Sequence, residues 1–163
     1  MLNSQDLRFI ADAMLGRLAR WLRLLGFDAL YYRDISDSDL LKHAVREDRV
    51  LLTRDTHFLN IKNLRKLLII HSDYPLEQVR EVLAAFGPGP FGPGRCPRCN
   101  GVLDPVGKKA EVRDLVPEHI FFSHASFQLC RSCGKVFWEG THLKRFRERT
   151  GLLIEESGRE VRK

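Results

Sequence analysis

Four cysteines form two closely spaced pairs in the second half of the chain. Cys96 and Cys99 enclose Pro-Arg, Cys130 and Cys133 enclose Arg-Ser, and the first 95 residues contain no cysteine. Two such knuckles can present four thiolates as a tetrahedron, the usual coordination of structural zinc. A redox pair is the alternative, but two pairs without a thioredoxin-like strand–helix context favour zinc. We therefore expect one Zn²⁺ that contributes folding energy to a small module.

Acidic side chains follow each apolar run of the first half. The runs cover residues 7–11, 29–32, 50–53 and 67–70, and the candidate acids after them are Asp12, Asp37, Asp39, Asp55 and Asp73. If the runs are parallel strands, their carboxyl ends meet at one edge of a sheet, where α/β domains bind ligands. Helix capping explains any one of these aspartates. Several together would repel one another without a cation, and their oxygen atoms suit Mg²⁺ or Mn²⁺.

Strands and helices are expected to alternate through the first 86 residues. Spacing of 3.6 residues predicts helices at 12–25, 36–47 and 76–86, with a weaker one around 57–65. Pro75 suits the first position of a helix, and Gly26 suits the end of one. The alternation predicts a small three-layer α/β domain with a parallel four-stranded sheet.

A stretch rich in glycine and proline divides the chain. Residues 87–95 contain four glycines and three prolines, which cannot continue a helix or a central strand. We place an α/β domain at 1–86, a linker at 87–95, a cysteine module at 96–150 with a basic helix at 141–149, and a charged tail at 151–163. Gly101 and Gly134 are expected to permit the turns after the two cysteine pairs.

Composition narrows the class of protein. The 163 residues are 44% hydrophobic and 29% charged, which excludes a disordered or collagen-like chain. No apolar run reaches the roughly 18–20 residues of a membrane span, and the polar start does not resemble a signal peptide, so we expect a cytoplasmic protein. Five of the six net positive charges lie in residues 87–163, which suits an anionic polymer as partner.

Three stretches of the sequence resemble one nuclease family. FIADAMLGRLARWLRLLGFDALYY, SDSDLLKHA and RVLLTRDTHFL are similar to the Mut-seven C-terminal ribonuclease family, over roughly residues 7–150 including both cysteine pairs. The resemblance implies a PIN-like nuclease domain with an acidic metal site, followed by a zinc ribbon. It carries over Asp12, Asp39 and Asp55 as ligands of Mg²⁺ or Mn²⁺. Asp37 is an alternative to Asp39, and Asp73 matches a fourth acid by position only.

Basic and aromatic residues near these sites are candidates for contacts with RNA. Arg17, Arg20 and Arg23 recur at three-residue intervals, and Arg54 precedes Asp55. Guanidinium groups bind phosphates bidentately. A solvated helix face explains the first three as well, and an ion pair explains Arg54.

Two further features bear on the site and on RNA binding. Thr53 could orient a carboxylate, or could simply end a strand, and Trp21 lies among leucines, which favours core packing. Lys144 and Arg145 lie in a basic segment interleaved with aromatic residues, a pattern that suits single-stranded or looped RNA.

The sequence thus predicts a ribonuclease that hydrolyses RNA phosphodiester bonds with Mg²⁺ or Mn²⁺ and binds RNA partly through its zinc ribbon. The alternative is a non-catalytic RNA-binding or adaptor protein on a degenerate scaffold. Because a degenerate nuclease would usually have lost some of Asp12, Asp39 and Asp55, the presence of all three favours the enzyme.

Overall fold

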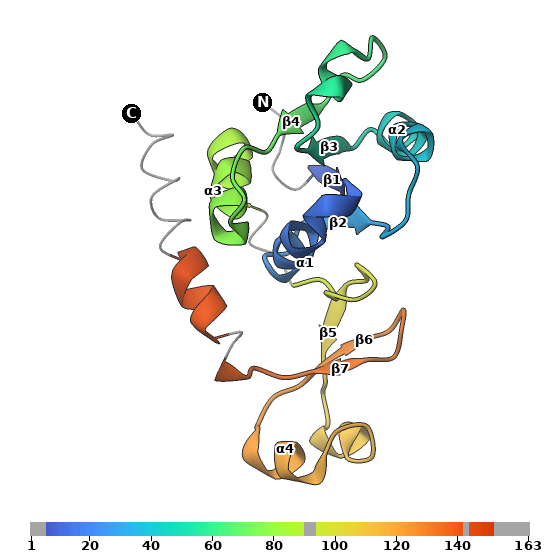
Figure 1. The fold of residues 1–163 in the computed structure, drawn as a ribbon. Helices are drawn as coiled ribbons and strands as arrows, with labels where there is room; N and C mark the ends of the chain where they lie inside the picture. Colours follow the sequence, from blue (N-terminus) through green and yellow to red (C-terminus); the bar gives the residue numbers. More distant parts are fainter. Residues whose placement is uncertain (1–5, 90–93, 142–143, 152–163) are drawn as a thin grey trace.

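A four-stranded parallel sheet forms the first part of the protein. The computed structural model describes residues 6–89, 94–141 and 144–151. Strands β1 (Arg8–Ala11), β2 (Asp28–Tyr31), β3 (Val50–Thr53) and β4 (Leu67–Ile69) lie in the order β2-β1-β3-β4 (Figure 1). All neighbouring pairs are parallel, which confirms the predicted sheet.

Helices cover both faces of this sheet (Figure 1). On one face lie α1 (Gly16–Leu24) and α3 (Pro75–Phe86), and on the other lie α2 (Asp37–Arg46) and the 3₁₀ turn η2 (Thr56–Asn60). Along β1, Phe9 packs with α1 and α3 whereas Ile10 packs with α2. Side chains alternate between the faces of a strand, so a sheet covered on both sides needs apolar residues throughout. The predicted three-layer α/β architecture is confirmed.

Two predicted helices differ from the structure. The segment after β1 begins with a 3₁₀ turn, η1 (Ala13–Leu15), and α1 starts only at Gly16. The helix expected around 57–65 is wrong, since only η2 forms and the backbone is already extended at Ile61. Phe58 is buried and anchors η2 to the core, but residues 62 and 63 are exposed, so no continuous apolar face supports a longer helix.

A three-stranded antiparallel sheet carries the cysteine pairs. It contains β5 (Leu103–Pro105), β6 (Gln128–Cys130) and β7 (Val136–Phe137) in that order. An insertion between β5 and β6 holds the 3₁₀ turn η3 (Lys109–Val112) and the short helix α4 (Glu118–Ser123), at the far end of the molecule in Figure 1. This insertion accounts for the long separation of the two cysteine pairs.

The C-terminal part continues from β7 into a helix. Residues 144–151 are helical, two residues beyond the predicted end, while 142 and 143 lie outside the described residues. The predicted tail also lies outside them except for residue 151, as do residues 90–93 of the predicted linker, and the domain limits stay predictions. In the part of the chain that the structure describes, no helix is long and apolar enough to cross a membrane.

Buried polar contacts join the two sheets. Arg23 of α1 is only 6% exposed. Its Nε donates to the carbonyl oxygen of Ala29 at 2.8 Å, and its Nη1 donates to that of Pro97 at 2.9 Å. Asn100 accepts from the backbone N–H of Ala29 at 3.0 Å and donates to the Asp28 carboxylate at 2.8 Å. The expectation that Arg23 lies on a solvated or phosphate-binding face is wrong, because the first cysteine knuckle covers that side of α1.

Replacing Arg23 tests this junction. Arg23→Met should lower the free energy of unfolding by about 2–4 kcal/mol, because two buried carbonyl groups lose a charged donor. Arg46→Met removes an exposed arginine from α2 and should change stability by about 0.5 kcal/mol or less. Urea unfolding of both variants measures the difference. Equal stabilities would show that the junction contributes nothing to folding.

Candidate functional site

Thr53 links the acids that follow the two central strands. Asp12, at the end of β1, is 8% exposed, and its Oδ2 accepts from the Thr53 hydroxyl at 2.8 Å. That hydroxyl also accepts from the backbone N–H of Asp55 at 3.0 Å. The backbone N–H of Asp12 donates to Leu52 across the β1–β3 pair at 2.9 Å. Asp12 and Asp55 are therefore held beside one another at the carboxyl edge of the sheet.

The turn after Asp12 is held by a tyrosine from the neighbouring strand. Asp12 Oδ1 accepts from the backbone N–H of Ala13 at 2.6 Å, which begins η1. The Tyr31 hydroxyl donates to the Ala13 carbonyl oxygen at 2.9 Å. A Cβ atom on Gly16 would lie 2.8 Å from the Tyr31 ring, so this close packing requires glycine at the start of α1. Asp12 therefore both caps η1 and forms part of the candidate site.

The outer acids have different surroundings. Asp39 is exposed and bonded to the Ser36 hydroxyl and the Lys42 ammonium, both at 3.0 Å. The hydrogen bond from Lys42, and then that from Ser36, lowers the pKa of Asp39. Asp73 forms an ion pair with Arg54. Within the described residues Asp37 has no side-chain hydrogen bond or ion pair. Unlike Asp39 and Asp73, its carboxylate therefore has no partner in this part of the chain.

The four cysteines form one compact centre. The Sγ atoms of Cys96 and Cys133 are 3.8 Å apart, and those of Cys99 and Cys130 are 3.4 Å apart. All four lie within 4.8 Å of one another. Around a tetrahedral zinc with Zn–S bonds of ~2.3 Å the sulfur atoms are ~3.8 Å apart. The cysteines are therefore positioned to bind a metal ion and fit structural zinc. Across residues 6–89, 94–141 and 144–151, no other group of three or more His, Cys, Asp and Glu side chains comes this close.

The free thiols differ in acidity. Burial raises the pKa of Cys96 to about 12. Burial acts in the same direction on Cys130, but hydrogen bonds from the backbone of Cys133 and from neighbouring thiols lower its pKa to about 7. Because zinc binds thiolates, loading the centre must release protons, and acid must oppose binding.

One structurally important residue of the first cysteine knuckle, Asn100, was not identified from the sequence. Asn100 follows Cys99 with φ 70°, and Gly134 follows Cys133 with φ 74°. Gly101, expected to make the first turn, instead lies where a Cβ would be 2.7 Å from Ser132. Asparagine and glycine are the residues that most readily adopt positive φ, so the matching positions after each pair are the signal that could have identified Asn100.

The candidate RNA-contacting residues lie on two helices and one loop. Arg17 and Arg20 are exposed on α1, and Lys144 and Arg145 are exposed on the helix at 144–151. Arg54 is held by Asp73, as the ion-pair alternative anticipated.

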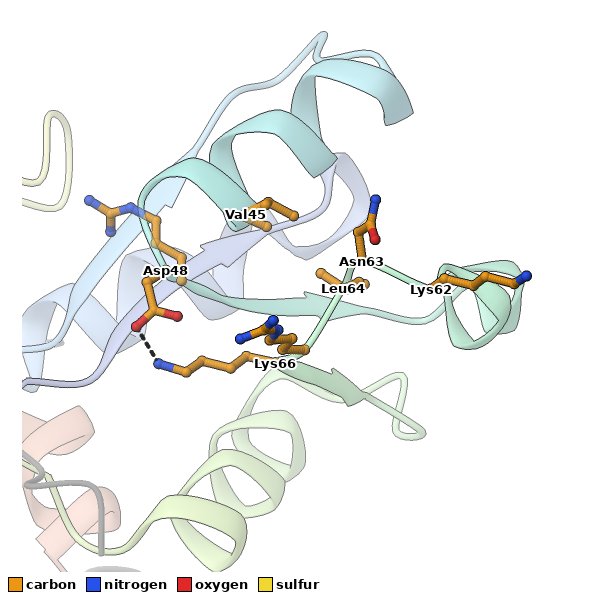
Figure 2. Close-up of a pocket in the computed structure, with 9 residues that line it drawn as sticks. Val45, Asp48, Lys62, Asn63, Leu64 and Lys66 are labelled. Carbon is orange, nitrogen blue, oxygen red and sulfur yellow. Dashed lines mark hydrogen bonds and ion pairs between the residues drawn. The ribbon is translucent and has the colours of Figure 1, made fainter.

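A hollow lined by Lys62 and Lys66 lies away from these acids, beside the residues that precede β3 and β4 (Figure 2). Lys66 pairs there with Asp48 at 2.6 Å. It is at the amino edge of the sheet, opposite the acids.

Fold and site together define an α/β domain with aspartates at its carboxyl edge, followed by a four-cysteine metal-binding ribbon. The family model of the Mut7-C RNAse domain matches residues 7–150, and the chain belongs to this family. Comparisons with curated proteins and with solved structures find no match. The family assignment made from the sequence is confirmed.

Zinc should be present at one ion per chain and should be lost with acid. We expect elemental analysis to find zinc in the protein at pH 7.5, with less retained after dialysis at pH 5 because protons compete for the thiolates. Cys96→Ser should lose the metal and unfold the ribbon, while Ser132→Ala in the same centre should keep both. A zinc-free protein whose ribbon stays folded would contradict this assignment.

Proposed function

We propose that this protein is a ribonuclease that hydrolyses RNA phosphodiester bonds at the carboxyl edge of β1 and β3. The observation that carries the proposal is the Asp12–Thr53–Asp55 arrangement, in which the Thr53 hydroxyl donates to the Asp12 carboxylate and accepts from the backbone N–H of Asp55. Membership of an RNase domain family supports the same reaction. The substrate and partner is RNA, and the expected products carry a 5′-phosphate and a 3′-hydroxyl.

Asp12 and Asp55 fit a hard divalent cation. Mg²⁺ is commonly held by one or two carboxylates, with waters and substrate phosphates completing its coordination. A buried carboxylate at Asp12 beside an exposed one at Asp55 matches that requirement, and the Asp37 carboxylate has no other partner among the described residues and is available for a third contact. When bound, Mg²⁺ or Mn²⁺ would supply an activated water and neutralise charge on the scissile phosphate.

The surrounding residues keep the acids in place. The Thr53 hydroxyl and the Ala13 N–H each donate to one oxygen of Asp12, which restricts rotation of its carboxylate. The Asp55 Oδ1 accepts from the backbone N–H of His57 at 2.8 Å, leaving Oδ2 available. Arg17, exposed at the second position of α1, can neutralise a neighbouring phosphate of the RNA strand.

Binding of RNA without hydrolysis is the second candidate. It is favoured by the pairing of Asp39 with Lys42 and of Asp73 with Arg54, since these cations occupy two of the predicted acids. The two candidates differ in the outcome of a cleavage assay.

Neutralising either central acid should abolish cleavage. Asp12→Asn and Asp55→Asn should each reduce the rate by at least about 100-fold on labelled single-stranded RNA with Mg²⁺ or Mn²⁺, since a ligand charge is lost. Asp48→Asn makes the same change at the opposite edge of the sheet and should leave the rate unchanged. Full activity of both central variants at saturating Mn²⁺ would end the assignment. Asp37→Asn and Asp39→Asn in the same assay identify which acid of α2 contributes.

Thr53 is predicted to act as a positioning residue. Thr53→Val keeps the shape of the side chain but removes the hydroxyl, and should reduce cleavage about 10- to 100-fold while weakening activation by Mn²⁺. Thr53→Ser retains the hydroxyl and should restore most of both. The rate as a function of Mn²⁺ concentration separates this role from a loss of stability, which would lower the rate equally at every concentration.

A further inference from the structure

A groove lies where α1, the cysteine ribbon and the C-terminal helix meet. Its volume is about 530 Å³, within the range of sites that hold small organic ligands. Among the described residues that line it are four aromatic side chains, which include Trp21, Trp138 and Phe146, and three arginines, Arg20, Arg145 and Arg149. These come from sequence positions more than a hundred residues apart, so the groove exists only because the two halves pack together.

The aromatic side chains that line the groove lie at the edges of the α/β core and of the ribbon core. Trp21 packs partly against the core of the α/β domain, as expected from the sequence, and its ring centroid lies 4.9 Å from that of Phe146. Trp138 is also half-buried and packs against the ribbon core. Both tryptophans of the chain therefore border this groove. Half-buried indole rings are rigid and can stack on planar ligands.

The arginines that line the groove have no acidic partner among the described residues. Arg20, Arg145 and Arg149 are exposed, and within the described residues none of them forms a hydrogen bond or an ion pair. None of the described residues that line the groove is acidic. Arg147 on the same helix points elsewhere, since it pairs with Glu139 at 3.3 Å. Three like charges beside an aromatic surface favour a ligand that is both planar and anionic.

We propose that this groove binds a nucleotide of single-stranded RNA, with its base on the tryptophan rings and its phosphates on the arginines. The proposal rests on the proposed function in taking RNA as the substrate. An RNA duplex is excluded because its bases are already stacked on one another. An acidic peptide would match the arginines but leave the aromatic surface without a partner.

The helix α1 connects the groove to the acidic edge. Gly16 begins α1 just beyond η1 and Asp12, and Trp21 lies five residues further on, about 7.5 Å along the helix axis. Arg17 and Arg20 are exposed along the way. RNA held in the groove can therefore follow α1 toward Asp12, and the groove would select unpaired strands for cleavage.

Intrinsic tryptophan fluorescence reports on this groove directly, because both tryptophans line it. We would titrate the full-length, zinc-loaded protein without Mg²⁺ or Mn²⁺ with a 12-nucleotide single-stranded RNA. Stacking should quench the fluorescence. A duplex of the same sequence, and an abasic strand with the same phosphates, should quench much less.

Matched variants distinguish RNA binding in the groove from general electrostatic attraction of RNA to the protein. Arg145→Gln with Arg149→Gln should reduce affinity at least about 10-fold, whereas Arg147→Gln with Lys135→Gln removes the same charge outside the groove and should have a much smaller effect. Trp138→Ala should reduce affinity about 5- to 100-fold, and Trp138→Phe should restore most of it. Zinc content of each variant verifies that the ribbon is intact.

Each outcome decides the proposal. Binding without quenching, with equal affinities for groove and control variants, would overturn it and leave the ribonuclease proposal standing. Quenching and competition by poly-glutamate as effective as by RNA would overturn the assignment to RNA. Quenching by single-stranded RNA in a protein that never cleaves it would support the groove and refute the hydrolysis.

Discussion

A buried guanidinium group holds the two halves of this protein in one arrangement. Burial lowers the pKa of Arg23, while Cys96 and Cys99 act in the opposite direction and favour its charged form. Removing a charge from water is costly, so the guanidinium stays ionised only where acceptors and negative charge surround it. The carbonyl oxygens of Ala29 and Pro97 supply the acceptors. The hydrogen bond to Pro97 joins α1 to the first cysteine knuckle.

The helix α1 makes three different sets of contacts. Leu18 and Leu22 face the core between the sheet and α3, Arg23 faces the cysteine knuckle, and Arg20 and Trp21 face the groove. A nine-residue helix has room for all three because residues one or two apart project in directions roughly 100° or 200° apart. The same helix begins just after Asp12, so the position of the ribbon and the position of the acidic edge are set by one rigid element.

The acidic edge combines fixed and adjustable groups. Asp12 is buried and bonded at both oxygens, whereas Asp55 and Asp37 are exposed. The Thr53 hydroxyl donates to the Asp12 carboxylate and accepts from the backbone N–H of Asp55, so it positions both residues without adding charge. The outer aspartates Asp39 and Asp73 are paired with Lys42 and Arg54.

The amino-acid sequence by itself determined the strands, the order of the elements and which residue types gather at the acidic edge and at the cysteine centre. Apolar runs define a sheet buried on both faces, aspartates follow each run, and paired cysteines define a metal centre. All of these are local patterns of period or spacing. The tertiary structure decided that Arg23 is buried, that Trp21 borders a groove, that Thr53 joins two acids, and that the segment around 57–65 makes only one turn. A helical pattern tells which side chains share a face, but it contains no information about which distant segment covers that face. Those outcomes depend on contacts between residues far apart in the chain, formed only when both halves have folded.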